Sequence, residues 1–196
     1  MKRYLQPNKT IKYTAKMTSS KSDKDIKIQI TRQFRDINIT SPKIRKLIKT
    51  ICMRFDKNEN TNPNKFEVSV VIVDDNEFKK LNYQFLKKKS LSDCLSFDLS
   101  DYNEPGSPKI FELVINGQMA QRQAKLRKHS EQAELALYIT HGLLHNFGFD
   151  DLKQSMAKKM HAKEDEILQE LNYGLVYNTK IESKNSYTYK KRKLKK

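Results

Sequence analysis

The sequence predicts a single domain of the α/β or α+β class, in which helices pack on a mixed sheet of about four strands. Two observations support this fold. Runs of β-branched residues alternate with longer runs of helical period, in the order β-α-β-α-β-β-α-α. The chain also has 196 residues, 37% of them hydrophobic, which is enough for one substantial core.

The first half of the chain contains two predicted strands and two predicted helices. Residues 25–32 (DIKIQITR) alternate apolar and polar side chains, which is typical of a half-buried strand. Residues 40–56 place apolar side chains at helical spacing after a Thr-Ser-Pro start that suits a helix N-terminus. Residues 66–75 (FEVSVVIVDD) form a continuous Val/Ile run, which predicts a buried strand. Residues 76–88 predict a short amphipathic helix.

The second half continues with two strands and then two helices. Residues 92–100 (SDCLSFDLS) and 109–117 (KIFELVING) predict strands, and the turn-rich residues 101–108 (DYNEPGSP) join them. From about residue 117 to 147 the apolar period is helical, and a second helix is expected from about 152 to 171.

The net charge of +16 lies toward the two ends of the chain, around a nearly neutral middle. We expect residues 1–24 to form a basic flexible arm, residues 25–173 to form the folded domain, and residues 174–196 to form a basic flexible tail. Basic ends favour a polyphosphate partner through counterion release. Solvated lysine-rich tails without a partner are the alternative.

No apolar run approaches membrane-spanning length, so no membrane partner is expected. The start of the chain lacks the apolar core of a signal peptide. Cys52 and Cys94 lie in apolar surroundings, which favours reduced core residues in an intracellular protein.

A histidine pair at the end of the predicted helix is the strongest chemical signal. His141 and His145 stand four residues apart, which places both imidazoles on one helix face. Gly148 then breaks the helix, and either Asp150 or Asp151 could reach the same ion. Two histidines and one carboxylate leave a coordination position open, as in catalytic metal sites. A pair of histidines that is simply packed in the core is the alternative.

Gly142 occupies the place where metalloproteases with the HExxH pattern have a glutamate base. The missing base argues against a peptidase. A bound ion would still activate water and stabilise charge on a phosphate.

The segment HGLLHNFGFDD resembles the signature H-G-x-L-H-x-x-G-[YF]-D-H of the YbeY family, the metal-dependent endoribonucleases of rRNA maturation. The resemblance extends over about residues 25–172. It includes four further segments: VSVVIVDDNEFKKLN, SDCLSFDLS, ELVINGQMA and AKKMHAKEDEIL.

This resemblance implies that His141, His145 and Asp151 hold one divalent ion, zinc or a similar metal, and form the catalytic site. Asp151 stands where the family has its third histidine ligand. Leu86 stands where the family has an arginine that contacts phosphate, and Lys87, Lys88 and Lys89 follow as substitute point charges.

Two residues near the expected cleft are further candidates for substrate binding. Asp93 either positions a ligand or caps a turn, and Ser96 is a hydrogen-bond donor for a phosphate. His161 is expected to face solvent among the charges of the last helix.

The resemblance implies a single-strand-specific endoribonuclease of rRNA processing, with RNA and a ribosomal subunit as partners, in the cytoplasm or in an organelle. The alternative is a catalytically inactive relative that binds rRNA or ribosomes through its basic arms. A metal-dependent hydrolase of a substrate other than nucleic acid is a third hypothesis.

Overall fold

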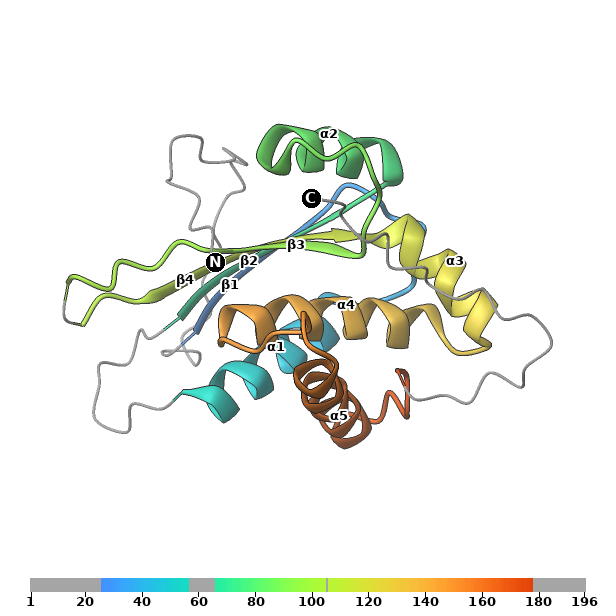
Figure 1. Cartoon of the computed structure of the whole chain (residues 1–196). Coiled ribbons are helices and arrows are strands. Elements are labelled where there is room, and N and C mark those ends of the chain that lie inside the picture. Colours follow the sequence, from blue (N-terminus) through green and yellow to red (C-terminus); the bar gives the residue numbers. More distant parts are fainter. Residues whose placement is uncertain (1–25, 57–65, 105, 178–196) are drawn as a thin grey trace.

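A computed structural model describes residues 26–56, 66–104 and 106–177, and shows one layered α+β domain (Figure 1). The strands are β1 (Ile26–Arg32), β2 (Phe66–Val73), β3 (Cys94–Asp98) and β4 (Lys109–Asn116). The helices are α1 (Ser41–Phe55), α2 (Asp75–Leu86), α3 (Gly117–Arg127), α4 (Glu131–Asn146) and α5 (Gln154–Glu170).

The four strands form one sheet in the order β1-β2-β4-β3. β1, β2 and β4 are mutually parallel, and β3 pairs antiparallel with β4 at the edge of the sheet. The predicted class and the predicted mixed sheet are therefore confirmed. The two central parallel strands, β2 and β4, carry the Val/Ile-rich runs expected where helices cover both faces, whereas β1 alternates apolar and polar residues.

The two faces of the sheet are covered by different helices (Figure 1). α2 packs on one face through Phe78 and Leu81, against Val71, Val114 and Leu95. α1 and α4 cover the other face, and α5 packs on α4. α4 lies between the sheet and α5, and it also contacts α1 and α3. A side chain on α4 is thus surrounded by several elements, which is what a preorganised site requires.

The helix predicted from residue 117 to 147 is two helices, and this part of the prediction is wrong. α3 ends at Arg127 and is followed by the C-cap Lys128 at φ +58°. α4 begins after Ser130, whose side chain accepts a hydrogen bond from the Ala133 N–H. A serine N-cap stabilises a new helix start. The apolar period continued across this corner because both helices bury side chains in the same core.

α4 approaches the sheet most closely at Gly142. A Cβ atom at this position would lie 2.9 Å from Cδ2 of Leu113 and 3.4 Å from Sγ of Cys94. Cys94 and Cys52 are free thiols, as expected. Burial raises the pKa of Cys52 to about 12 and that of Cys94 well above its ordinary value, so both are poor nucleophiles at neutral pH.

The packed domain continues past residue 173, where the sequence suggested that a tail begins. Val176 is fully buried, and its N–H and that of Tyr177 donate to Oδ1 of Asp165. The predicted arm 1–24 and the remainder of the predicted tail lie outside the described residues. Among the described helices, none has the length and hydrophobicity needed to span a membrane.

Candidate metal centre

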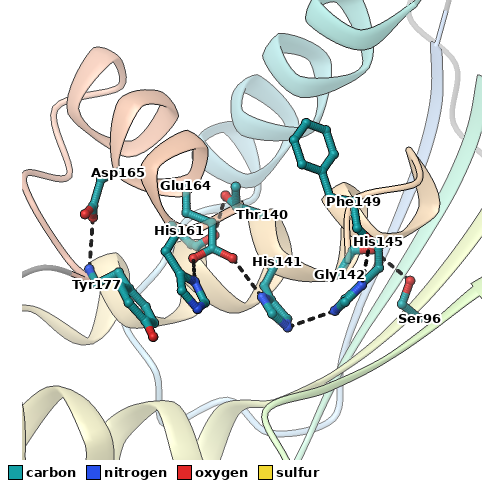
Figure 2. Close-up of polar contacts among 11 residues, drawn as sticks. Ser96, Thr140, His141, Gly142, His145, Phe149, His161, Glu164, Asp165 and Tyr177 are labelled. Carbon is teal, nitrogen blue, oxygen red and sulfur yellow. Dashed lines mark hydrogen bonds and ion pairs between the residues drawn. The ribbon is translucent and has the colours of Figure 1, made fainter. Parts of the chain in front are cut away.

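His141 and His145 face each other on the last two turns of α4 (Figure 2). Their ring centroids are 4.6 Å apart, the rings are nearly perpendicular, and the two Nε2 atoms are 3.1 Å apart. The helical spacing read from the sequence therefore does bring the two imidazoles together. Their facing Nε2 atoms define the centre of the candidate site.

The other nitrogen of each ring has a partner that fixes the ring's proton. Nδ1 of His145 lies 3.1 Å from the carbonyl oxygen of Phe149, which can only accept. Nδ1 of His141 lies 2.7 Å from Oε1 of the Glu164 carboxylate. Both Nδ1 atoms are therefore donors, and in neutral rings both Nε2 atoms carry lone pairs.

Two lone pairs that face each other at 3.1 Å repel unless a proton or a metal ion lies between them. Zinc binds imidazole nitrogen at about 2.0–2.1 Å, so one ion can bind two nitrogens at this separation. Nδ1 atoms that donate to a carbonyl or a carboxylate are also the usual second shell of zinc-bound histidines. The histidine geometry therefore fits a metal ion.

A turn at Gly148 brings Asp151, the third candidate ligand, close to the two histidines. Gly148, at φ +88°, follows α4 as a left-handed residue that reverses the chain. Asp151 comes next to the pair: one ligand atom from each of His141, His145 and Asp151 lies within 4.8 Å of the others. Asp150 instead accepts a hydrogen bond from the Leu152 N–H through Oδ1. Of the two aspartates, the structure groups Asp151 with the histidines.

Glu164 of α5 links His141 to a third histidine. Its carboxylate is fully buried, and its two oxygens lie 2.7 Å from Nδ1 of His141 and 2.8 Å from Nδ1 of His161 (Figure 2). A buried carboxylate is costly unless it is paired and hydrogen-bonded. Glu164 is therefore held by both imidazoles and fixes the orientation of each.

The expectation that His161 faces solvent is wrong, because only 15% of its side chain is exposed and its Nδ1 is engaged by Glu164. Sequence reasoning also missed Glu164. A signal for it was present: Met160, Glu164, Ile167 and Leu168 share one buried stripe of α5, so a carboxylate occupies a core position. A charged residue inside an apolar stripe indicates a specific partner.

The pKa of His141 is raised. Burial alone would lower this pKa, but the hydrogen bond to Glu164 and the negative charges of Asp93, Glu164 and Asp151 more than offset the burial. The site therefore favours positive charge at the His141 imidazole.

The predicted substrate residues Asp93 and Ser96 lie beside α4. The negative charge of Asp93 is one of the influences that raise the pKa of His141. Oγ of Ser96 lies 2.8 Å from the Gly142 carbonyl oxygen and 2.5 Å from Oδ1 of Asn146. The Ser96 hydroxyl thus joins β3 to α4 at Gly142 and Asn146.

Lys87, Lys88 and Lys89 are exposed at the C-terminal end of α2, on the sheet face opposite α4. Lys87 takes a left-handed conformation with φ +57°. The amines of Lys87 and Lys89 lie 5.6 and 5.9 Å from the centre of the Tyr83 ring. The structure does not group these lysines with the histidines.

Comparison with known proteins gives matches over most of the chain. The family model described as Endoribonuclease YbeY matches residues 29–172. An Endoribonuclease YbeY of Thermodesulfovibrio yellowstonii is 30% identical over 155 residues, which cover 74% of this chain and 98% of the relative. One of Myxococcus xanthus is 38% identical over 106 residues, covering 53% of this chain and only 36% of that relative's length.

Among solved structures, the solution structure of TM1509 from Thermotoga maritima matches with a TM-score of 0.49 and 22% identity, over 74% of this chain and 91% of that one. The family match begins within β1 and spans every later helix and strand through the end of α5, including both histidines, Asp151 and Glu164. The family suggested by the sequence motif is thereby confirmed: this chain belongs to the Endoribonuclease YbeY family.

Proposed function

We propose that this protein is a metal-dependent endoribonuclease that hydrolyses phosphodiester bonds in single-stranded regions of rRNA during ribosome maturation. His141, His145 and Asp151 are its proposed ligands for one zinc ion. The observation that carries this proposal is the pair of Nε2 atoms 3.1 Å apart, with both Nδ1 atoms engaged as donors and Asp151 beside them. Membership of the family supplies the reaction class.

When bound, the ion would provide Lewis-acid activation of water and of a phosphate oxygen. The residues of the chain orient the ligands and set the charge of the site. Glu164 orients the His141 ring through Nδ1, and the Phe149 carbonyl does the same for His145. The carboxylate of Asp151 makes the centre less positive than three imidazoles would. Asp93 adds further negative charge near His141.

The substrate is proposed to be RNA because the chain carries a net charge of +16, most of it near its ends. In this proposal Lys87, Lys88 and Lys89 hold the RNA backbone at a distance from the reacting bond, and Asp93 and Ser96 line the approach to the ion. The ribosomal subunit is the proposed partner. The reaction would take place where ribosomes assemble, in the cytoplasm or, as the alternative, in an organelle.

The test combines metal analysis with RNA cleavage by the purified full chain. We expect about one zinc ion per chain, loss of cleavage with a chelator, and recovery when zinc is returned. A His141→Ala protein purified in the same way controls for contaminating ribonucleases and should cleave no RNA. Single-stranded and duplex RNA compared side by side test the strand preference.

The alternative hypothesis, a catalytically inactive relative that binds RNA, predicts the opposite results. RNA binding that weakens with salt, together with no metal and no turnover after zinc is supplied, would contradict the nuclease proposal. Cleavage of a peptide rather than RNA would contradict it as well, and would favour the third hypothesis.

A further inference from the structure

Four rings lie in a row that begins at the candidate metal centre and runs away from it (Figure 2). His145 contacts His141, and the His141 ring is nearly parallel to that of His161, at a centroid distance of 6.4 Å and an angle of 13°. Tyr177 stacks directly on His161, at 3.4 Å and 12°. The shared carboxylate of Glu164 holds the two parallel imidazoles. The row therefore leads from the candidate metal ligands to Tyr177.

Tyr177 is placed by specific contacts. Oδ1 of Asp165 accepts hydrogen bonds from the N–H groups of Val176 and Tyr177, at 3.1 and 2.9 Å. The Val176 side chain is fully buried, and Gly174 turns the chain with φ +84°. The backbone at Tyr177 is thus anchored on α5 before the basic C-terminal sequence begins.

Tyr177 is nevertheless partly exposed to solvent. One face lies on His161, yet 42% of the residue remains exposed. Burying this much aromatic surface on a partner is favourable, and every nucleobase offers a flat face for it. Residues 171–196 carry eight lysines and arginines but only one acidic residue, a charge that suits a phosphate backbone.

We infer that Tyr177, backed by His161, is a stacking platform for a base of single-stranded RNA next to the scissile bond. The inference rests on the proposed function, and it adds a substrate-binding residue that lies outside the family match of 29–172. Proteins that bind single strands commonly combine aromatic platforms with basic segments. A base on Tyr177 would hold its flanking phosphates beside the His141–His145 centre.

A different role for Tyr177 is to clamp His161 against Glu164 and so support the metal ligands. The two roles separate experimentally. A clamp changes zinc content when it is removed, whereas a platform changes RNA affinity and leaves the zinc content as it was.

The chain has no tryptophan, so Tyr177→Trp introduces a single fluorescent reporter at the platform. The zinc-loaded Tyr177→Trp protein is mixed with a phosphorothioate-linked oligoadenylate, which resists hydrolysis. Stacking of adenine should quench the tryptophan emission. The matched control is Tyr102→Trp, since Tyr102 is also an exposed tyrosine, at 66%, but lies in the connection between β3 and β4.

Affinity and turnover complete the test. Tyr177→Ala should weaken binding of the oligonucleotide by about 5- to 150-fold, the range expected for one base–aromatic stack. Tyr177→Phe should bind like the parent, because the phenyl ring keeps the stacking face. Both variants should retain the parent's zinc content.

Unchanged emission of Tyr177→Trp at saturating RNA would overturn the inference, as would parental affinity in Tyr177→Ala. Loss of zinc from Tyr177→Ala would also overturn it, in favour of the clamp. If Tyr177→Ala cleaves RNA with the parent's KM, the platform is wrong and the nuclease stands. Quenching without any turnover in the parent would support base stacking on Tyr177, but would contradict the nuclease and with it the place of the platform next to a scissile bond.

Discussion

Nδ1 of His141 lies 2.7 Å from Oε1 of Glu164, a carboxylate that is fully removed from solvent. This contact fixes which nitrogen of His141 is left for a metal. We expect Glu164→Gln to lower zinc affinity by about 10- to 100-fold, as is usual when a second-shell partner of a ligand is lost. Competition with a chromophoric chelator measures the affinity.

Glu166→Gln on the same helix is the control, because Glu166 is exposed and pairs only with Lys163 and Arg54 among the described residues. It should leave zinc affinity unchanged. Equal affinities for Glu164→Gln and the parent would show that the carboxylate does not act on the metal site.

Substitution of Asp150 and of Asp151 should have different effects on the zinc content of the protein. Asp151→Ala is expected to reduce or abolish the stoichiometric zinc, because Asp151 is grouped with both histidines. Asp150→Ala should keep the zinc, since Asp150 accepts from the Leu152 N–H. Elemental analysis of the purified proteins decides the matter, and Asp151→His, which restores the family's residue type, should retain the metal. Full zinc in Asp151→Ala would remove Asp151 from the ligand set.

Close packing at Gly142 leaves no room for a glutamate side chain at the position where the HExxH pattern has one. Because an added Cβ would lie 2.9 Å from Cδ2 of Leu113, Gly142→Ala should destabilise the fold by about 1–3 kcal/mol. Chemical denaturation measures the loss. Leu113→Val removes the Cδ atoms, so the double variant should lose less than the sum of the two single variants. Strict additivity would contradict this close approach.

The ion pair between Asp75 and Arg122 ties α2 to α3 and gives stability a specific pH dependence. Burial would raise the pKa of Asp75, but hydrogen bonds from Arg122 and Asn116 outweigh it and hold this pKa below the ordinary 3.8. A lowered folded-state pKa adds stability that is fully present above 3.8 and lost as the pH falls below it.

Asp75→Asn should therefore cost no more than about 1 kcal/mol at pH 7, given the partial exposure of the pair, and the deficit should shrink at acidic pH. Denaturation at several pH values measures it. Asp101→Asn, in the exposed turn before β4, is the control and should show no such trend. A deficit that is constant across the range would contradict the assignment.

Much of this protein follows from local patterns in its sequence. The Val/Ile runs of β2 and β4 identified buried strands because strands covered on both faces are apolar throughout. The four-residue spacing of His141 and His145 placed both rings on one helix face because the α-helix has 3.6 residues per turn. Gly148 indicated that the chain reverses after this helix. These features depend on neighbours along the chain, so the sequence alone determined them.

Tertiary structure decided the rest. The division between α3 and α4 was hidden because both helices bury side chains in one core, and the left-handed Lys128 and the Ser130 cap mark it in the structure. The hydrogen bonds of Glu164 to His141 and His161 join two helices. The position of Tyr177 depends on its hydrogen bond to Asp165 and on burial of Val176. The proximity of Asp151 to both histidines, and the hydrogen bond of Asp150 to the Leu152 N–H, are likewise seen only in the folded chain. Such contacts arise from packing between elements, which periodicity along one element does not encode.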